Sequence, residues 1–131
     1  MNISLLMLQF THGVEIGAHQ AYLGHFARTN DLKVKEIADD EMLHQKQIRC
    51  ILAKHGATTK LIFDVPFLLV GKTVSLFCKI SPLFMLNLVA NMLEKFAVFS
   101  YDVLANRFPE DRVALLEMAA KELEHEEYFK L

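Results

Sequence analysis

The sequence predicts an all-α protein, a four-helix bundle made of two antiparallel helical hairpins that a long apolar crossover joins. Three observations support this class. Apolar residues recur at helical rather than alternating spacing, glycine and proline are scarce (5 and 3 residues), and no Asn-Gly or Asp-Gly turn is present. With 131 residues, 53% of them hydrophobic, the chain is expected to form a single domain over residues 1–131.

Turn-forming residues divide the chain into four expected helices, which cover about residues 3–28, 32–55, 83–107 and 110–129. Asn30 and Asp31 separate the first two, and Gly56 follows the second as a C-terminal cap. Pro109 separates the last two and suits the first turn of a helix. Because both connections are short, the helices within each pair should be antiparallel neighbours.

The segment between the two hairpins, residues 57–82, is apolar and interrupted. Pro66, Gly71 and Pro82 are expected to break any long helix there, which leaves a crossover between the hairpins. The alternative is a simple up-down bundle in which this segment forms a fifth helix.

Charge and composition argue against several classes of protein. A net charge of −2 without a basic face disfavours nucleic-acid binding. Residues 1–14 contain no Lys or Arg, so no secretory signal is expected, and no uncharged run reaches the ~20 residues that span a membrane. Cys50 and Cys78 lack CxxC spacing and are expected to be buried free thiols of a reducing compartment. We therefore expect a cytoplasmic protein.

Two Glu-x-x-His pairs lie on otherwise apolar helix faces. In the second expected helix Glu41 and His44 share a face with valine, isoleucine and alanine, so both should point inward. In the fourth helix Glu122 and His125 occupy the same kind of apolar row, 81 positions after the first pair. A single pair of this type carries little information, whereas two on facing helices suggest a shared site.

Each remaining helix contributes one carboxylate in apolar surroundings. Glu15 is the only Asp, Glu, Lys or Arg in residues 1–27, and Glu94 lies with a single lysine in the otherwise uncharged segment 83–101. The separation of Glu15 from Glu94 is 79 positions, close to that of the two Glu-x-x-His pairs. At about 1.5 Å per residue, the six groups fall within one or two helical turns of the same level. The chain thus resembles two similar hairpins related by an approximate two-fold axis.

Buried carboxylates need a strongly positive partner, and two metal ions supply it. Two glutamates can bridge the metals while each metal takes one further glutamate and one histidine. This oxygen-rich set with two imidazoles favours two iron ions, with manganese as the alternative. The expected ligands are Glu15, Glu41, His44, Glu94, Glu122 and His125. The competing interpretation is a core whose acids are neutral or face water.

Three further side chains have two interpretations each. Asp40 either hydrogen-bonds the outer nitrogen of a ligand histidine or is an exposed acid beside Asp39. Tyr22 and Tyr101 follow the glutamates of the first and third helices by seven residues, and they either line an oxygen pocket or fill the core.

The other histidines are not expected to bind metal. His12 and His19 flank Glu15 on the same face, but Glu15 already completes the ligand set. His25 and His55 are expected to be surface or cap residues.

With these motifs, the chain resembles the ferritin-like diiron carboxylate superfamily, and most closely the demethoxyubiquinone hydroxylase family of ubiquinone biosynthesis. "HGVEIGAHQAYLGH" is similar to the family's first-helix segment, "DDEMLHQ" and "KELEHEE" to its two Glu-x-x-His segments, and "LEKFAVFSY" to its third-helix segment. "VPFLLVG" resembles the family's membrane-facing, quinone-contacting segment. The chain departs from the family at Ile16 and Ser100, which replace a tyrosine and a histidine, while all six ligand positions are kept.

The resemblance implies a ferritin-like bundle and a diiron oxidoreductase, a monooxygenase-like hydroxylase that uses O2, an external electron donor and a hydrophobic, quinone-like substrate. Two other functions compete with it, a rubrerythrin- or ferritin-like ferroxidase or peroxidase, and a metal-stabilised helical bundle without enzymatic activity. The apolar stretches at residues 63–77 and 83–88 favour either a homodimer or peripheral contact with the inner face of the membrane.

Overall fold

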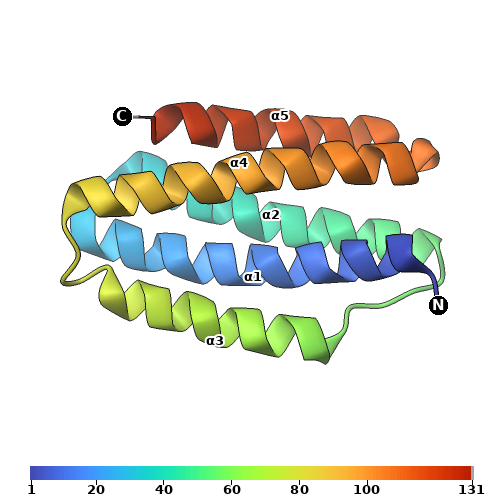
Figure 1. Ribbon diagram of the computed structural model, residues 1–131, viewed down its shortest axis with the longest axis horizontal. Coiled ribbons are helices and arrows are strands. Elements are labelled where there is room, and N and C mark those ends of the chain that lie inside the picture. Colours follow the sequence, from blue (N-terminus) through green and yellow to red (C-terminus); the bar gives the residue numbers. More distant parts are fainter. Residues whose placement is uncertain (131) are drawn as a thin grey trace. The chain divides into compact units, whose positions relative to one another are not determined.

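The protein is all-helical, as predicted. A computed structural model describes residues 1–130, and these contain no strand. The helices are α1 (Ile3–Thr29), α2 (Leu32–Lys54), α3 (Leu61–Phe77), α4 (Leu83–Arg107) and α5 (Arg112–Tyr128), with a short 3-10 turn, η1, at Pro109–Asp111 (Figure 1).

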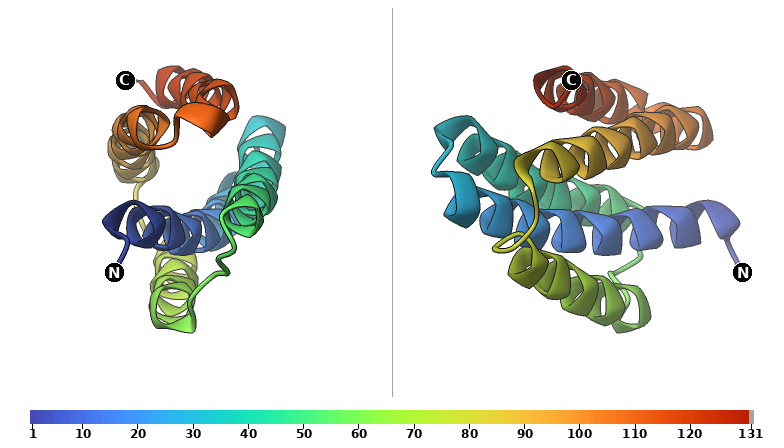
Figure 2. Two further views of the ribbon diagram at one scale, coloured as in Figure 1. Left: turned by 90° about the vertical axis from the view of Figure 1, so that its right-hand side faces the viewer. Right: turned by 60° about the vertical axis from the view of Figure 1, so that its left-hand side comes forward.

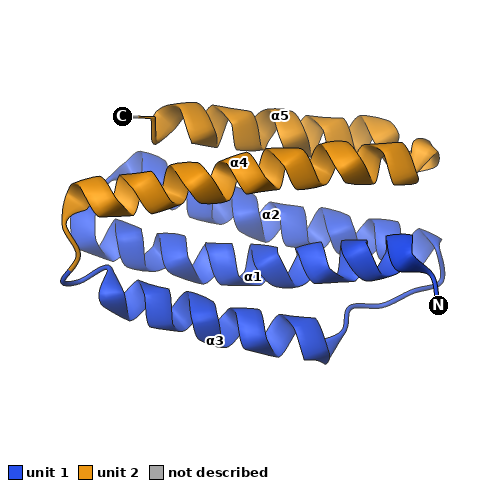
Figure 3. Ribbon diagram, in the orientation of Figure 1, with its two compact units in different colours: residues 1–80 blue, residues 81–131 orange. Residues whose placement is uncertain are grey.

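The chain divides into two compact units, one of residues 1–80 and one of residues 81–131 (Figure 3). The first contains α1, α2 and α3, and the second contains α4, η1 and α5. Each unit includes one of the predicted helical hairpins. The single domain over residues 1–131 and the ferritin-like arrangement of the hairpins stay predictions.

The α1–α2 hairpin follows from its capping residues. Asn2 caps α1 by accepting a hydrogen bond from the Leu5 amide (3.2 Å), and Asn30 ends it in the left-handed conformation (φ 56°). Asp31 then caps α2 by accepting from the Lys33 amide at 2.9 Å. The polar Asn30-Asp31 pair therefore both stops one helix and starts the next, as the sequence predicted.

The crossover contains a continuous helix, which corrects the expectation that Pro66 and Gly71 would break it. Both residues lie inside α3. The helix persists because its packing against α1 outweighs the lost hydrogen bond of the proline. Phe10 of α1 packs edge-on against Phe63 and Phe67, with ring centroids 5.8 and 5.1 Å apart.

The backbones of α1 and α3 approach each other closely through glycine. The two helices run parallel, and α1 has α2 as its other neighbour in this unit (Figure 2). A Cβ atom built on Gly71 would lie only 2.8 Å from Gly17 Cα, and one on Gly24 would lie 2.7 Å from Ser75 Cβ. Gly71, which looked like a helix breaker, is thus a contact point between helices.

In the second unit α4 and α5 form an antiparallel pair (Figure 1). Pro109 begins the 3-10 turn, and the α-helix that was expected from residue 110 starts at Arg112 instead. The buried side chains of this unit come from both helices and include Ala90, Tyr101, Leu104, Leu115, Met118 and Phe129.

Helix α4 also carries a long exposed apolar surface. By length and composition only, this 25-residue helix is long and apolar enough to cross a membrane. Of its most apolar stretch of 18 residues, 17% is buried. The uncharged runs of the sequence had argued against any such helix. The uncharged run of residues 80–93 ends at Glu94 and Lys95, whereas a window of helical length tolerates these two charges.

Candidate metal centre

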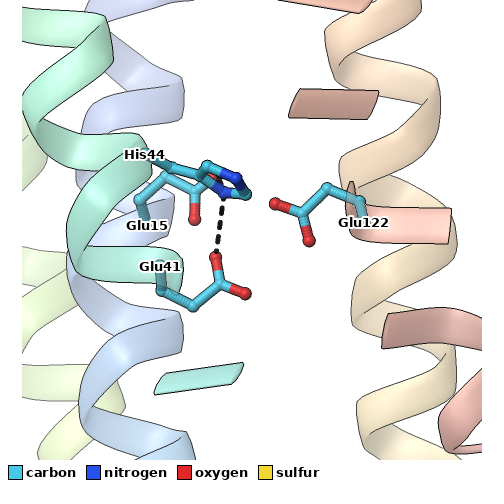
Figure 4. A group of neighbouring side chains, drawn as sticks. All are labelled: Glu15, Glu41, His44 and Glu122. Atoms are coloured by element: carbon cyan, nitrogen blue, oxygen red, sulfur yellow. Dashed lines mark ion pairs between the residues drawn. The ribbon is translucent and has the colours of Figure 1, made fainter. Parts of the chain in front are cut away.

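The first unit brings Glu15, Glu41 and His44 together as one buried cluster, the unit 1 triad. Glu15 comes from α1 and the other two from α2, and all three are at most 3% exposed. His44 Nδ1 lies 3.6 Å from Glu41 Oε2 and 3.8 Å from Glu15 Oε1. The side chains point toward a common space, with the imidazole nitrogen facing both carboxylates (Figure 4).

The second unit builds the same arrangement from Glu94 of α4 with Glu122 and His125 of α5, the unit 2 triad. These side chains are also at most 2% exposed. His125 Nδ1 donates to Glu122 Oε2 at 3.2 Å and lies 3.6 Å from Glu94 Oε2. In both triads the histidine therefore presents Nδ1 to two glutamates, one on its own helix and one on its hairpin partner.

The donor chemistry of each triad fits a metal ion. Within each triad one ligand atom per residue can be chosen so that these atoms lie within 4.8 Å of one another. Two buried carboxylates beside one imidazole repel each other unless positive charge or protons compensate them. Carboxylate oxygen with imidazole nitrogen is a donor set that iron and manganese accept. In each unit a Glu-x-x-His pair thus lies beside the glutamate of the partner helix of its hairpin, while the shared six-residue ligand set stays a prediction.

The structure gives the burial of Tyr22, Tyr101 and Asp40, the three residues that had two interpretations each. Tyr22 and Tyr101 are buried, at 2% and 0% exposure. Asp40 is half-buried, whereas Asp39 is exposed and pairs with Lys35 at 2.5 Å. Asp39 is thus a solvent-facing acid.

His12 and His19 are buried but engaged elsewhere than in the triads. His12 lies between Asp64 of α3 and Arg49 of α2, at 2.9 and 3.1 Å. His19 Nδ1 donates to the Ala38 carbonyl at 2.6 Å. Both histidines therefore link α1 to neighbouring helices.

Sequence reasoning missed the partners of His12. Asp64 is the only acid in residues 57–82, the same signal of a lone charge in an apolar segment that singled out Glu15 and Glu94. Its partner could not be inferred, because the contact joins residues 52 positions apart on helices whose pairing the local sequence does not specify.

Two predictions of burial outside the triads are wrong. His25 was expected to be a surface or cap residue, but it lies inside α1 and is 4% exposed. Burial lowers its pKa below the ordinary value, against a smaller opposite effect of Asp31. Cys50 was expected to be buried but is exposed on the face of α2 that carries Lys46 and Lys54.

Cys78 is buried as expected, and burial raises its pKa. His55, as expected, caps the C-terminus of α2.

Comparison with protein-family models, with curated proteins and with solved structures finds no match for this chain.

Proposed function

We propose that the two triads together bind two metal ions in one dinuclear carboxylate centre of the ferritin-like type. The observation that carries this proposal is repetition. Each unit unites a glutamate of its first hairpin helix with a Glu-x-x-His pair of its second. Two triads of identical composition, at matching spacing in the sequence, supply the four carboxylates and two imidazoles of such a centre.

The activity that we propose is that of a diiron oxidase or hydroxylase related to the demethoxyubiquinone hydroxylases, acting on a hydrophobic, quinone-like substrate. When bound, the iron ions would supply the redox chemistry that activates O2, with electrons from an external donor. The protein's carboxylates would balance the charge of the ions, and the neutral imidazoles of His44 and His125 would serve as ligands. In this proposal Tyr22 and Tyr101, which are buried on the helices of Glu15 and Glu94, line the oxygen pocket.

Metal content and O2 consumption test the proposal. Protein loaded anaerobically with Fe(II) should bind two ions per chain, and adding O2 with a reductant and a short-chain quinone should produce substrate-dependent O2 uptake. Glu94→Gln should lower both the iron content and the uptake, while Glu117→Gln, an exposed acid of α5, should change neither. Uptake that is independent of any quinone would contradict the hydroxylase assignment.

A ferroxidase or peroxidase is the second candidate, because the buried tyrosines seven residues after Glu15 and Glu94 resemble those of rubrerythrin-like peroxidases. It predicts consumption of Fe(II) or hydrogen peroxide without an organic substrate. A purely structural metal site predicts neither reaction, only a rise in melting temperature when metal is added.

The exposed surface of α3 suits a lipid membrane, where a quinone-like substrate would dissolve. Its outward side chains are apolar, and the lysines at residues 60, 72 and 79 are exposed while the one acid of the helix, Asp64, is buried. Apolar side chains with lysines and no exposed acid complement an anionic bilayer surface. We therefore propose peripheral attachment to the inner face of the membrane. Binding to anionic but not neutral vesicles supports it, whereas a stable homodimer without vesicle binding would overturn it.

A further inference from the structure

Polar cross-links from α1 to α2 lie on both sides of the unit 1 triad. On one side His19 Nδ1 donates to the Ala38 carbonyl at 2.6 Å, three residues before Glu41. Level with the triad, Gln45 Nε2 donates to the backbone carbonyl of Glu15 at 3.3 Å. These bonds fix the register of two antiparallel helices at the height where their ligands meet.

On the other side of the triad, His12 connects three helices. The Arg49 guanidinium of α2 can only donate, so His12 Nε2 accepts its hydrogen bond (3.1 Å), and Nδ1 carries the proton that it donates to Asp64 (2.9 Å). His12 is 3% exposed and stands one helical turn before Glu15. The rotation of α1 about its axis is therefore restrained from both α2 and α3.

The second unit places different residues at the matching positions. His12 lies three residues before Glu15 and His19 four residues after it. The residues at the same offsets from Glu94 are Asn91 and Val98. Asn91 Nδ2 donates to the Glu126 carbonyl of α5 at 3.0 Å, so one cross-link is kept. Val98 has no polar side-chain group, and the link that His19 makes therefore has no counterpart at this position.

We propose that the two triads bind metal with unequal affinity and that the unit 1 triad fills first, because His19, Gln45 and His12 hold it in binding geometry before the metal arrives. This inference rests on the proposed metal centre and adds an order of filling to it. A preorganised site loses less conformational freedom on binding, so more of its interaction energy becomes affinity. His19, Gln45 and His12 are then positioning residues, which act through the ligands rather than on the metal.

Titration with Co²⁺ under anaerobic conditions, followed by visible absorption and calorimetry, tests the order of filling. The wild-type protein should bind two ions in two resolved steps. Glu94→Gln should retain the tighter step and Glu15→Gln should lose it. Two equal steps, or a tighter step that survives Glu15→Gln, would overturn unequal filling while leaving the dinuclear centre intact. If wild-type protein binds no Co²⁺, both proposals fail.

The positioning role has its own variants. His19→Val, which installs the residue of the second unit, should weaken the tighter step about tenfold or more, while His19→Gln, which keeps a donor, should restore most of the affinity. The weaker step should stay within about twofold in both variants. Circular dichroism checks that each variant keeps its helices.

Gln45 provides a second test that does not depend on replacing a buried histidine. Gln45→Ala should weaken the tighter step about tenfold. Gln47→Ala is its matched control, because within the described chain the Gln47 side-chain oxygen has no hydrogen-bond partner. Equal effects of Gln45→Ala and Gln47→Ala on the tighter step would overturn the positioning role.

Discussion

Replacing Gly71 by alanine should destabilise the protein, although the same change in an ordinary helix is favourable. At an unhindered helical position, alanine gains about 1 kcal/mol over glycine. Here the added Cβ would meet the Gly17 backbone, with Cα only 2.8 Å away. A backbone contact cannot be relieved by turning a side chain, so α1 and α3 must move apart, which costs about 3 kcal/mol.

The net loss is therefore about 2 kcal/mol in the free energy of unfolding. For 131 residues, an unfolding entropy of about 2.1 cal/mol/K per residue converts this loss into a melting temperature about 7 °C lower. Thermal unfolding followed by circular dichroism measures it. Thr73→Ala, an exposed change on the same helix, should shift the free energy by no more than about 0.5 kcal/mol. A Gly71→Ala protein that melts higher than wild type would refute the close packing of α1 on α3.

Two further predictions concern buried titratable groups. Because burial lowers the pKa of His25, the folded state binds fewer protons than the unfolded state below the ordinary value of 6.5. The free energy of unfolding should therefore fall as the pH is lowered through that range, by at most about 1.4 kcal/mol per pH unit from this group. Urea titrations in the presence of a chelator should show a shallower pH dependence for His25→Gln, and an unchanged one would contradict the shift. Exposed Cys50 should react with a thiol reagent well before Cys78, whose burial raises its pKa, and mass spectrometry of the labelled peptides would reveal a reversed order.

Much of the fold follows from local signals in the sequence. Caps and turn residues at Asn30-Asp31 and Pro109 mark the two hairpin turns, and the predicted bounds of α1, α2 and α4 agree with the structure to within one residue. Helical phase was also informative at the triads. Glu41 and His44 share an apolar face, whereas neighbouring Asp39 does not, and burial follows that division.

The failures have a common physical origin in contacts between distant segments. Gly71 and Pro66 are locally unfavourable in a helix, yet both lie in α3, which packs closely on α1. His25 lies on α1, which packs against both α2 and α3. A helix with two neighbours buries more than one face, so a sequence pattern that assumes a single buried face does not predict the burial of His25. The link between His12 and Asp64 likewise needs the pairing of α1 with α3.

The central claim, that both triads bind metal in one dinuclear centre, is tested most directly by anomalous diffraction at the iron edge, on crystals grown with Fe(II). Two peaks about 3.5–4 Å apart are expected, one at each triad, with every peak contacted by its own histidine. The six contacting residues should be Glu15, Glu41, His44, Glu94, Glu122 and His125. Anomalous peaks elsewhere with none at the triads, or two peaks too far apart to share a carboxylate, would contradict the dinuclear centre.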